Sequence, residues 1–352
     1  MLFALDRSGD ESLNLLFDVN DDNLDVLTML RDYLVNHETY IKEEMIDKQR
    51  VKESFLYSLE DLYKIDKESI LHNYLSDGVK QLDPSIIRDN PYYKNIKFTN
   101  VKEDNWVLKN DSYQPYQGFV FNSHKVNCDE YFKEIPQIGF FDEEVEFPAV
   151  FQDEVLWMSV TPNEINTMEI PIKKAKGNII TFGLGLGYFA YRVSNKSEVR
   201  SVTIIERDNK VINLFKKHIL PKFVNKEKIT IIQEDAFTYV NNNDMHQFDY
   251  IFIDLHHDAS DGLDIYLKSV STLKDINFDF WILDSIILLV RKMLINIIYD
   301  EYYSENNNYE YQTIYDELIK SLKDYVFTSY EQIKELLSDE SIKSLLHKIS
   351  FK

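Results

Sequence analysis

The segment that most constrains the fold of this chain lies at residues 178–190, where a short apolar run leads into a turn rich in glycine. The run ends at Phe182, and Gly183, Gly185 and Gly187 follow at alternate positions before a stretch with helical character. Glycine lets a backbone turn sharply and approach a ligand that any Cβ would push away, and the free amides at a helix start attract electronegative groups. The pattern predicts a strand, a turn and a helix that together bind a nucleotide-containing cofactor.

Later apolar runs of the chain each close on an acidic residue. The first of them ends at Glu206, which stands 19 residues after Gly187 and can accept hydrogen bonds from both hydroxyls of a ribose. Three more runs end at Asp235, Asp254 and Asp284. Apolar runs of this length, separated by helix-length segments, predict a parallel sheet whose ligand edge lies at the carboxyl ends of its strands.

This order of motifs resembles the class I S-adenosylmethionine-dependent methyltransferases, a Rossmann-like family, over roughly residues 160 to 290. The resemblance implies that the glycine turn, with Leu184 inside it, lies against the methionine part of the cofactor. It also implies that Glu206, followed by Arg207, holds the ribose.

The same resemblance assigns the rest of the cofactor. Asp235 and Ala236, after the third strand, border the adenine, and Asp254 faces the methionine end and the substrate. We therefore expect an α/β protein with a Rossmann-like, doubly wound and mostly parallel sheet. Its expected function is the transfer of a methyl group from S-adenosylmethionine to a small-molecule or protein acceptor by in-line displacement.

Two other nucleotide-binding motifs share parts of this pattern. A nicotinamide or flavin dinucleotide fingerprint needs a third glycine where this chain has Tyr188, and it has no need for the acidic segment at Asp235. A phosphate-binding P-loop is excluded, because no Gly-Lys-Ser/Thr follows the glycines. The sequence favours S-adenosylmethionine, while a dinucleotide, or a turn that binds nothing, stays an alternative.

The segment just before the first strand supplies two further candidates. Thr161 and Pro162 suit the cap and the first turn of a helix, which places Glu164 in that turn. In related methyltransferases this segment often folds over the methionine end of the cofactor. We therefore include Met158 and Glu164 among the expected cofactor contacts, with an ordinary capped helix as the alternative.

The loop after the fourth strand holds the densest cluster of bases in the chain, from Asp254 to Gly262. His256 or His257 can take a proton from a hydroxyl or an amine near neutral pH, and Asp254 or Asp258 can orient that histidine. Neighbouring histidines point in different directions, so one is expected in the site and the other at the surface. We predict Asp254 and His257 as catalytic residues, and a polar loop without catalytic function is the alternative.

Asp254 also permits a metal interpretation. Catechol-type O-methyltransferases hold magnesium between an aspartate that ends the fourth strand and an Asp-Asn pair that ends the fifth, and Asp254 and Asp284 fall in similar places. Carboxylate oxygens suit this hard cation. Ser285 stands where that family has asparagine, so we expect no bound metal.

A second function is compatible with the same sheet. Spermidine synthases share it, carry a β element just before it, and use decarboxylated S-adenosylmethionine with acids that hold a cationic amine. They usually show a Gly-Gly-Gly-Asp-Gly turn and an Asp-Ser-Ser/Thr-Asp-Pro segment after the fourth strand. This chain has Gly-Leu-Gly-Leu-Gly at 183–187 and Asp-Leu-His-His-Asp at 254–258, which favours methyl transfer. A cofactor-binding interaction module without catalysis is the third alternative.

The patterns along the chain predict four parts. Residues 1–96 form a helical region, 97–160 a small β-rich element, 161–300 the cofactor-binding domain and 301–352 a helical extension. We expect the helical parts to shape the acceptor pocket or to form a homodimer contact.

Two details of these helical parts are specific enough to check. Residues 21–23 have capping side chains and predict a helix start, followed by an apolar stripe of Leu24, Leu27, Leu30 and Leu34. Toward the other end, the sequence predicts a helix over 286–303, a loop over 304–308 and a strand only at 325–328. The sheet is therefore either shortened at its far edge, or its last strands have no recognisable sequence pattern.

The formal charge of −21, from 60 acidic and 39 basic residues, limits the partners. A chain this acidic, without a basic face, repels phosphate backbones, so nucleic acid is not expected. There is no apolar run of 18 residues and no signal-peptide pattern, so no membrane span is expected. Cys128 is the only cysteine, which excludes an internal disulfide and favours a cytoplasmic location. The frequent Asn, Ile, Lys and Tyr are typical of an AT-rich bacterial genome.

Overall fold

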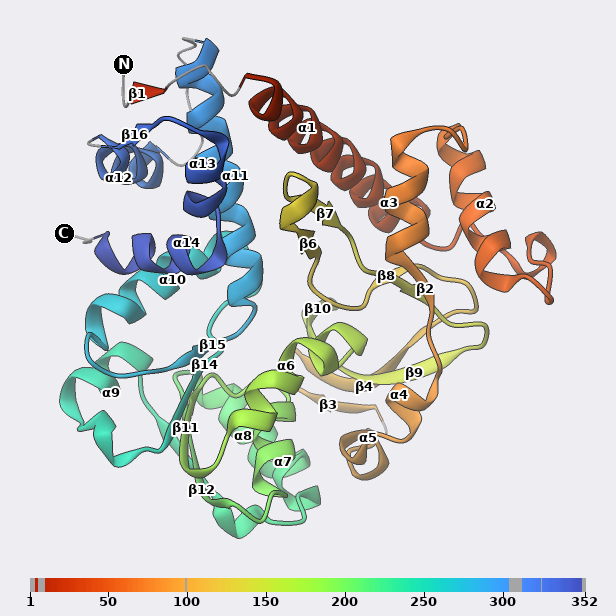
Figure 1. The fold of residues 1–352 in the computed structure, drawn as a ribbon. Helices are drawn as coiled ribbons and strands as arrows, with labels where there is room; N and C mark the ends of the chain where they lie inside the picture. Colours follow the sequence, from red (N-terminus) through yellow and green to blue (C-terminus); the bar gives the residue numbers. More distant parts are fainter. Residues whose placement is uncertain (1–3, 6–9, 99, 304–311, 324, 350–352) are drawn as a thin grey trace.

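The computed structural model of the chain describes residues 4–5, 10–98, 100–303, 312–323 and 325–349. Helices and strands are mixed along the chain, so the predicted α/β class is confirmed (Figure 1). Within these ranges the strands form five separate sheets, and one of them, with five strands, is parallel throughout. A single Rossmann-like sheet therefore does not account for the whole fold. The predicted loop at 304–308 lies outside the described residues.

The five-stranded sheet carries the glycine turn at its centre. Its spatial order is β13-β12-β11-β14-β15, and the glycine turn follows the middle strand. The strand bounds are β11 Gly177–Phe182, β12 Val199–Glu206, β13 Ile229–Gln233, β14 Tyr250–Ile253 and β15 Asp279–Phe280. Because the strand order reverses direction at β11, a crevice is expected at the carboxyl ends of β11 and its neighbours.

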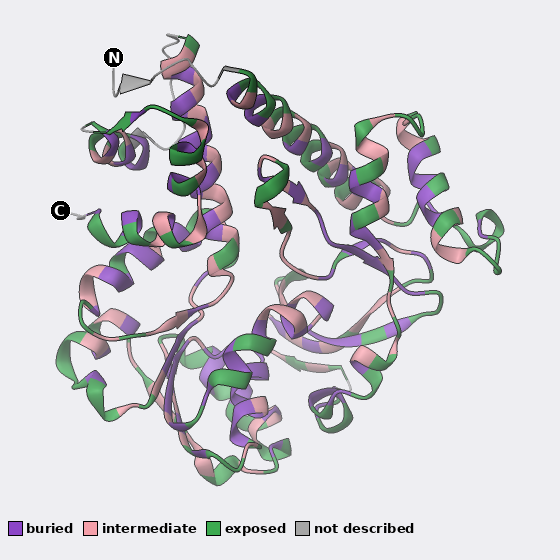
Figure 2. Cartoon of the chain, in the orientation of Figure 1, coloured by how far each residue is buried: buried purple, intermediate pink, exposed green. Residues whose placement is uncertain are grey.

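Helices cover both faces of this sheet. Successive residues of a strand point to opposite faces: Ile180 and Phe182 pack into one hydrophobic core with α9, α10 and α11, whereas Ile179 packs into another with α6, α7 and α8. Buried residues accordingly follow the strands and the inner sides of the helices (Figure 2). The helix bounds are α6 Pro162–Lys174, α7 Tyr188–Ser194, α8 Asn209–His218, α9 Ala236–Asn242, α10 Ala259–Thr272 and α11 Leu283–Tyr303.

The first helix begins earlier than predicted. Helix α1 spans Asp10–Asp32, so the proposed cap at residues 21–23 lies in its middle and the predicted helix start is wrong. The predicted stripe is wrong in part, because Leu24 is 56% exposed while Asn23 is buried and donates a 3.1 Å hydrogen bond to the carbonyl of Phe132. A π-helical turn at Tyr33–His37 follows, and then α2 Val51–Tyr63, α3 Ile70–Gly78, α4 Ser85–Arg88 and α5 Pro91–Asn95.

Short strands connect the helical region to the central sheet. They form a four-stranded antiparallel sheet, β10-β9-β4-β3, a three-stranded sheet, β2-β8-β5, and a hairpin, β6-β7. The strand β2 comes from the part predicted as helical, so a sheet crosses that predicted boundary. Edge strand β10 leads directly into α6. The bounds are β2 Val79–Gln81, β3 Val101–Glu103, β4 Trp106–Tyr113, β5 Phe119–Val120, β6 Lys125–Asn127, β7 Lys133–Ile135, β8 Ile138–Phe140, β9 Val145–Gln152 and β10 Val155–Ser159.

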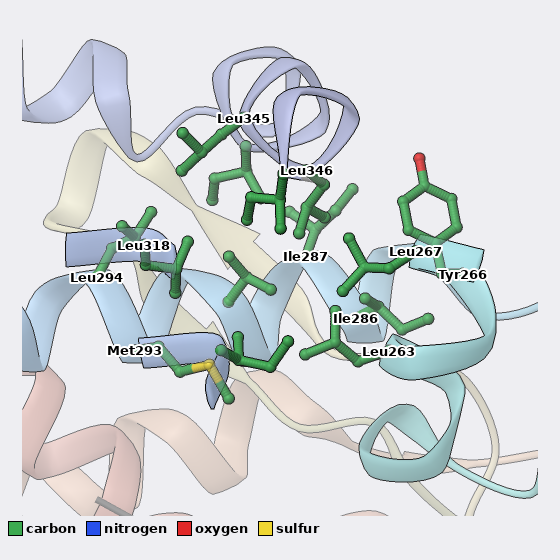
Figure 3. Packing of buried hydrophobic residues seen from close by; sticks show 14 of the residues in the cluster. Leu263, Tyr266, Leu267, Ile286, Ile287, Met293, Leu294, Leu318, Leu345 and Leu346 are labelled. Carbon is green, nitrogen blue, oxygen red and sulfur yellow. The ribbon is translucent and has the colours of Figure 1, made fainter. Parts of the chain in front are cut away.

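Helix α11 follows the last strand of the sheet almost at once. Asp284 lies in the first turn of α11, so the fifth strand predicted over 280–284 is wrong in its last residues. Side chains of α10, α12 and α14 pack around α11 (Figure 3). The strand-like segment at 325–328 contains β16, which pairs with β1 instead of extending the central sheet. The remaining bounds are β1 Ala4–Leu5, α12 Gln312–Leu322, β16 Val326–Phe327, α13 Tyr330–Leu336 and α14 Asp339–Lys348. None of the helices in the described ranges has both the length and the apolar character needed to cross a membrane.

Candidate active site

A cleft of about 730 Å³ opens at the carboxyl ends of β11, β12, β13 and β14. Its walls come from the turns after these strands, from the end of β10, from the first turn of α6 and from α10. This volume is in the range of pockets that enclose a small-molecule or cofactor ligand. Of the residues predicted from the sequence as catalytic or cofactor-binding, all except Gly187 line this cleft.

The glycine turn forms one wall of the cleft. Gly183 has φ +100° and Gly185 has φ +49°, both in the left-handed region where other residues are strained. A Cβ at Gly183 would overlap the carbonyl of Asp254, and one at Gly185 would overlap the thioether of Met158. Gly187 instead begins α7 and packs against α8, so its predicted contact with the cofactor is not supported.

Glu206 joins two of the turns that form the cleft. Its Oε2 accepts a 3.3 Å hydrogen bond from the amide of Leu184, and its Oε1 accepts a 2.8 Å hydrogen bond from the amide of Asp208. A carboxylate has about four acceptor positions, so both oxygens can also accept from ribose hydroxyls. Arg207, next in the chain, lines the same cleft.

Asp235 stands at the start of α9 with its carboxylate ionised. Its Oδ1 accepts a 3.0 Å hydrogen bond from the amide of Thr238, and this bond lowers the pKa of Asp235 below its usual range. The charge of Lys268 on α10 acts in the same direction. Ala236 lies beside Asp235 in the cleft wall. An ionised carboxylate here can accept a hydrogen bond from an amino group such as that of adenine.

Glu164 and Asp254 form a pair of carboxyl groups in the cleft, in which Glu164 is buried and Asp254 is partly buried. Burial raises the pKa of Glu164 well above its usual range, and the negative charge of Asp254 raises it further. Burial likewise raises the pKa of Asp254 to about 7. No ion pair in the described part of the chain involves either residue, and Oε1 of Glu164 has no hydrogen-bond partner there. Acidic groups in a cleft with raised pKa values and no charged partner are candidates for a functional site, and this pair can receive a cationic ligand.

The structure separates the two neighbouring histidines. His256 is buried and stacks on Phe280 with a ring-centroid distance of 4.7 Å. Burial lowers the pKa of His256 to about 4, so the ring is neutral at physiological pH. The side chain of His257 is 78% exposed at the mouth of the cleft, and its Nδ1 lies 3.3 Å from Oδ2 of Asp261. His257, the catalytic residue predicted from the sequence, is therefore the exposed histidine, and His256 is the buried one.

Asp258 is engaged in capping α10. Its Oδ1 accepts a 2.7 Å hydrogen bond from the amide of Ser260, while the carboxylate of Asp261 accepts one of 2.9 Å from the amide of Asp258. This reciprocal pair is a capping box, which satisfies amides at a helix start. The loop therefore presents Asp254, and not Asp258, to the interior of the cleft.

The structure does not bring Asp254 and Asp284 together. Asp284 and Ser285 line a separate cavity of about 160 Å³ with the buried Arg291, whereas Asp254 lines the main cleft. The magnesium alternative requires both aspartates at one ion. That alternative has no geometrical basis here, and the described ranges contain no cluster of three or more histidine, cysteine or acidic side chains arranged to hold a metal.

Several residues of the cleft had no signal in the sequence. Trp157 and Trp281 line it, and the indole of Trp281 donates a 3.0 Å hydrogen bond to the hydroxyl of Thr167 in α6. Lys268 also lines it, with its ammonium group 4.0 Å from the ring centroid of Phe237. These residues follow no spacing rule, because the folding of β10, β15 and α10 around the cleft brings them together.

This geometry defines an α/β protein with a cleft at the edge of a parallel sheet, and known proteins resemble the same part of the chain. Residues 163–274 match the spermine/spermidine synthase domain. Over 81 residues the chain is 32% identical to a polyamine aminopropyltransferase of Leptospira interrogans serogroup Icterohaemorrhagiae serovar copenhageni. That alignment covers 22% of this chain and only 16% of the relative, so this chain spans a small part of the relative's length.

Two solved structures also align with the chain. One is a spermidine synthase from Thermotoga maritima, with 16% identity and a TM-score of 0.26, covering 35% of this chain and 48% of the other. The second is a spermidine synthase in complex with the transition state analogue AdoDATO, with 17% identity and a TM-score of 0.26, covering 32% and 43%. Overlaps this limited carry no argument about function.

The prediction of a methyltransferase is wrong. The matched domain is that of spermine and spermidine synthases, and the curated relative is an aminopropyltransferase. The broader resemblance is supported, because spermidine synthases share the fold of the class I methyltransferases. The error has a physical origin. The glycine turn and the acids at the ends of β12 and β13 suit the adenosyl part of a ligand. They do not indicate which group is transferred from the sulfur.

Proposed function

We propose that the chain transfers an aminopropyl group from decarboxylated S-adenosylmethionine to an amine acceptor. The observation that supports this most directly is the pair of the buried Glu164 and the partly buried Asp254, for which the described residues provide no basic partner. The donor of that reaction carries a sulfonium and an ammonium, and the acceptor is an amine. Two carboxyl groups that lack a counterion in the free protein suit ligands that bring positive charge into the cleft. The matched domain at 163–274 supports the same assignment.

The charge of the cleft favours the decarboxylated donor over S-adenosylmethionine itself. The ordinary form carries a carboxylate at the end of the arm attached to sulfur. Near Glu164 and Asp254 that carboxylate would add negative charge beside two acidic groups whose ionised forms the cleft already disfavours, and like charges repel strongly there. Removal of the carboxylate leaves an arm that ends in an ammonium, which the same two groups attract.

The roles of the residues follow from their places in the cleft. Glu206 accepts from the ribose, and Asp235 accepts from the adenine amino group. Asp254, with its pKa near 7, removes a proton from the acceptor ammonium and frees the nitrogen lone pair. That lone pair attacks the arm carbon bonded to sulfur, the carbon–sulfur bond breaks, and its electrons stay on sulfur. The products are methylthioadenosine and the extended amine, which leaves as an ammonium, and Asp254 releases the proton that it removed to water.

The acceptor side of the cleft is largely aromatic and neutral. Trp157, Trp281 and the uncharged ring of His256 line it beside Asp254. Indole faces attract both methylene chains and cations. These surroundings support a linear aliphatic amine as the acceptor.

Purified protein tests this proposal directly. We expect methylthioadenosine to be released from decarboxylated S-adenosylmethionine only when a linear diamine such as 1,3-diaminopropane or 1,4-diaminobutane is present. Mass spectrometry of the amine should show the added aminopropyl group, and Asp254→Asn should abolish the release. A protein that binds the decarboxylated donor no better than S-adenosylmethionine, and releases no methylthioadenosine with any diamine or longer polyamine, would contradict the proposal.

A further inference from the structure

We propose that Glu164 recognises the primary ammonium at the end of the aminopropyl arm and thereby selects the decarboxylated donor. This inference rests on the proposed function and assigns one part of it to one residue. It makes Glu164 a specificity residue, separate from Asp254, which acts on the acceptor amine.

The first turn of α6 holds the Glu164 carboxylate inside the cleft. The helix begins at Pro162, whose ring fits the first helical position, and Glu164 follows in the same turn. Glu164 is only 6% exposed, it lines the cleft, and its Oε1 has no hydrogen-bond partner among the described residues. Leaving a buried carboxylate oxygen without a partner costs free energy. A fold that holds the group there in the free protein leaves it available for a ligand.

The basic side chains of the cleft do not compensate this carboxylate. Lys268 lies over the ring of Phe237, and its charge acts on Asp235, toward the adenine end. Arg207 lines the cleft next to the ribose residue Glu206, and no ion pair between Arg207 and Glu164 is present in the described part of the chain. The positive partner of Glu164 therefore has to come with the ligand.

The glycine turn itself offers no acid. Spermidine synthases usually show an aspartate as the fourth residue of this turn, and this chain has Leu186 there, fully buried and without a polar atom in its side chain. A donor whose arm ends in an ammonium still needs a negative partner. Glu164 lines the same cleft as the turn, from the helix that precedes the sheet, and provides that partner from a different element.

Two tyrosines of α5 connect this helix to the glycine turn and to the start of α6. The hydroxyl of Tyr92 donates to the carbonyl of Leu186 in the turn, and the hydroxyl of Tyr93 donates to the carbonyl of Val160, just before α6 begins. The distance between the turn and the start of α6 is therefore fixed by one short helix. This arrangement supports a fixed reach from Glu164 to a ligand that rests on the turn.

Calorimetry with two ligands isolates the recognition of the arm. Methylthioadenosine has the adenosine and the sulfur of the donor but no aminopropyl arm. At pH 8.5, Glu164→Gln should bind decarboxylated S-adenosylmethionine about 10- to 100-fold more weakly than the wild type, the loss expected for a hydrogen bond between charged groups. The affinity of this variant for methylthioadenosine should be unchanged. Its preference for the decarboxylated donor over S-adenosylmethionine should fall by the same factor. Glu164→Asp keeps the charge on a shorter side chain, so its affinity for the decarboxylated donor should lie between those of the wild type and Glu164→Gln.

The matched control is Glu169→Gln, which removes a carboxylate from the same helix outside the cleft, where Glu169 is paired with Arg192 at 3.0 Å. This control should leave both affinities unchanged. If Glu164→Gln loses affinity equally for both ligands, or loses affinity for neither, the role of Glu164 is overturned. If the wild type shows no preference for the decarboxylated donor over S-adenosylmethionine, the proposed function itself fails, and this result is distinct from the other two.

Discussion

The hydroxyl of Tyr92 donates a 2.6 Å hydrogen bond to the backbone carbonyl of Leu186, in the middle of the glycine turn. Tyr92 is completely buried, and the side chain of Asn90, at the start of the same helix, donates a 3.0 Å hydrogen bond to the hydroxyl of Tyr188. The helix α5 lies outside the segment 163–274 that matches the spermine/spermidine synthase domain. The shape of the turn therefore depends on a part of the chain that the matched domain does not include.

Tyr92→Phe tests this dependence. The variant keeps the ring but leaves the buried carbonyl of Leu186 without its donor, so we expect the free energy of unfolding to fall by about 1–3 kcal/mol. The KM for the donor should rise while the KM for the amine stays the same, because in the proposed function only the donor contacts the turn. Thermal unfolding and steady-state kinetics measure both effects, with Tyr57→Phe at a largely exposed position as the control. A destabilised variant with an unchanged KM for the donor would show that the turn keeps its shape without Tyr92.

Glu206→Ala should weaken donor binding by about 1–3 kcal/mol, because hydrogen bonds to a charged group are lost. Methylthioadenosine is the appropriate ligand for calorimetry, since it contains the ribose and lacks the arm. Glu206 also accepts from the amide of Leu184, so Glu206→Gln, whose amide oxygen can still accept there, separates the two effects. Unchanged affinity in both variants would remove Glu206 from the ribose role.

The parts of the site that could be predicted from sequence are those whose geometry is local. A strand that ends in a glycine turn places Gly183 and Gly185 beside a ligand, and acids at the ends of neighbouring parallel strands must meet at one edge. Glu206, Asp235 and Asp254 therefore lie together in the cleft, as expected.

Two features could not be predicted, because they depend on contacts between distant segments. The buried face of α1 includes Asn23, whose side chain bonds to the backbone of Phe132, 109 residues away, so a stripe of leucines was a poor guide to that face. The pair of carboxyl groups that supports the proposed function arises when α6 packs over the sheet and brings Glu164 near Asp254. Neither residue alone carries that information.

The two neighbouring histidines can be distinguished by a pair of variants. His256→Phe keeps the stacked ring but removes both nitrogen atoms, and we expect turnover to fall about tenfold or more, because these nitrogens have no hydrogen-bond partner among the described residues and are available to the acceptor. His257→Ala, at the exposed position, should change turnover by less than about twofold. Because the pKa of His256 lies near 4 and that of Asp254 near 7, the ionisation near pH 7 in the activity profile of the wild type should persist in His256→Phe. The opposite ranking of the two variants would establish His257, the residue predicted from the sequence, as the catalytic one.

Glu164 and Asp254 should make the ligand-free protein less stable as the pH rises. Asp254 has a pKa of about 7 in the folded protein and the usual value of 3.8 in the unfolded chain, so the folded state binds more protons between these values. The stability contributed by the protonated group is complete below pH 4 and is lost as the pH rises toward 7, and the raised pKa of Glu164 continues the same trend.

Asp254→Asn removes this penalty, so at pH 8 we expect the ligand-free variant to be about 1–3 kcal/mol more stable than the wild type, although it is inactive. The difference should vanish near pH 4, where Asp254 is protonated in both states, and Glu227→Gln at an exposed position should show neither effect. Urea unfolding across this pH range measures the difference. The decarboxylated donor should stabilise the wild type more than the variant and should release protons as it binds near pH 7, because its positive charge favours the ionised carboxylate. A wild type that gains stability relative to Asp254→Asn between pH 4 and 7 would mean that Asp254 already has a cationic partner in the free protein, and the cleft would then have no need of a cationic ligand.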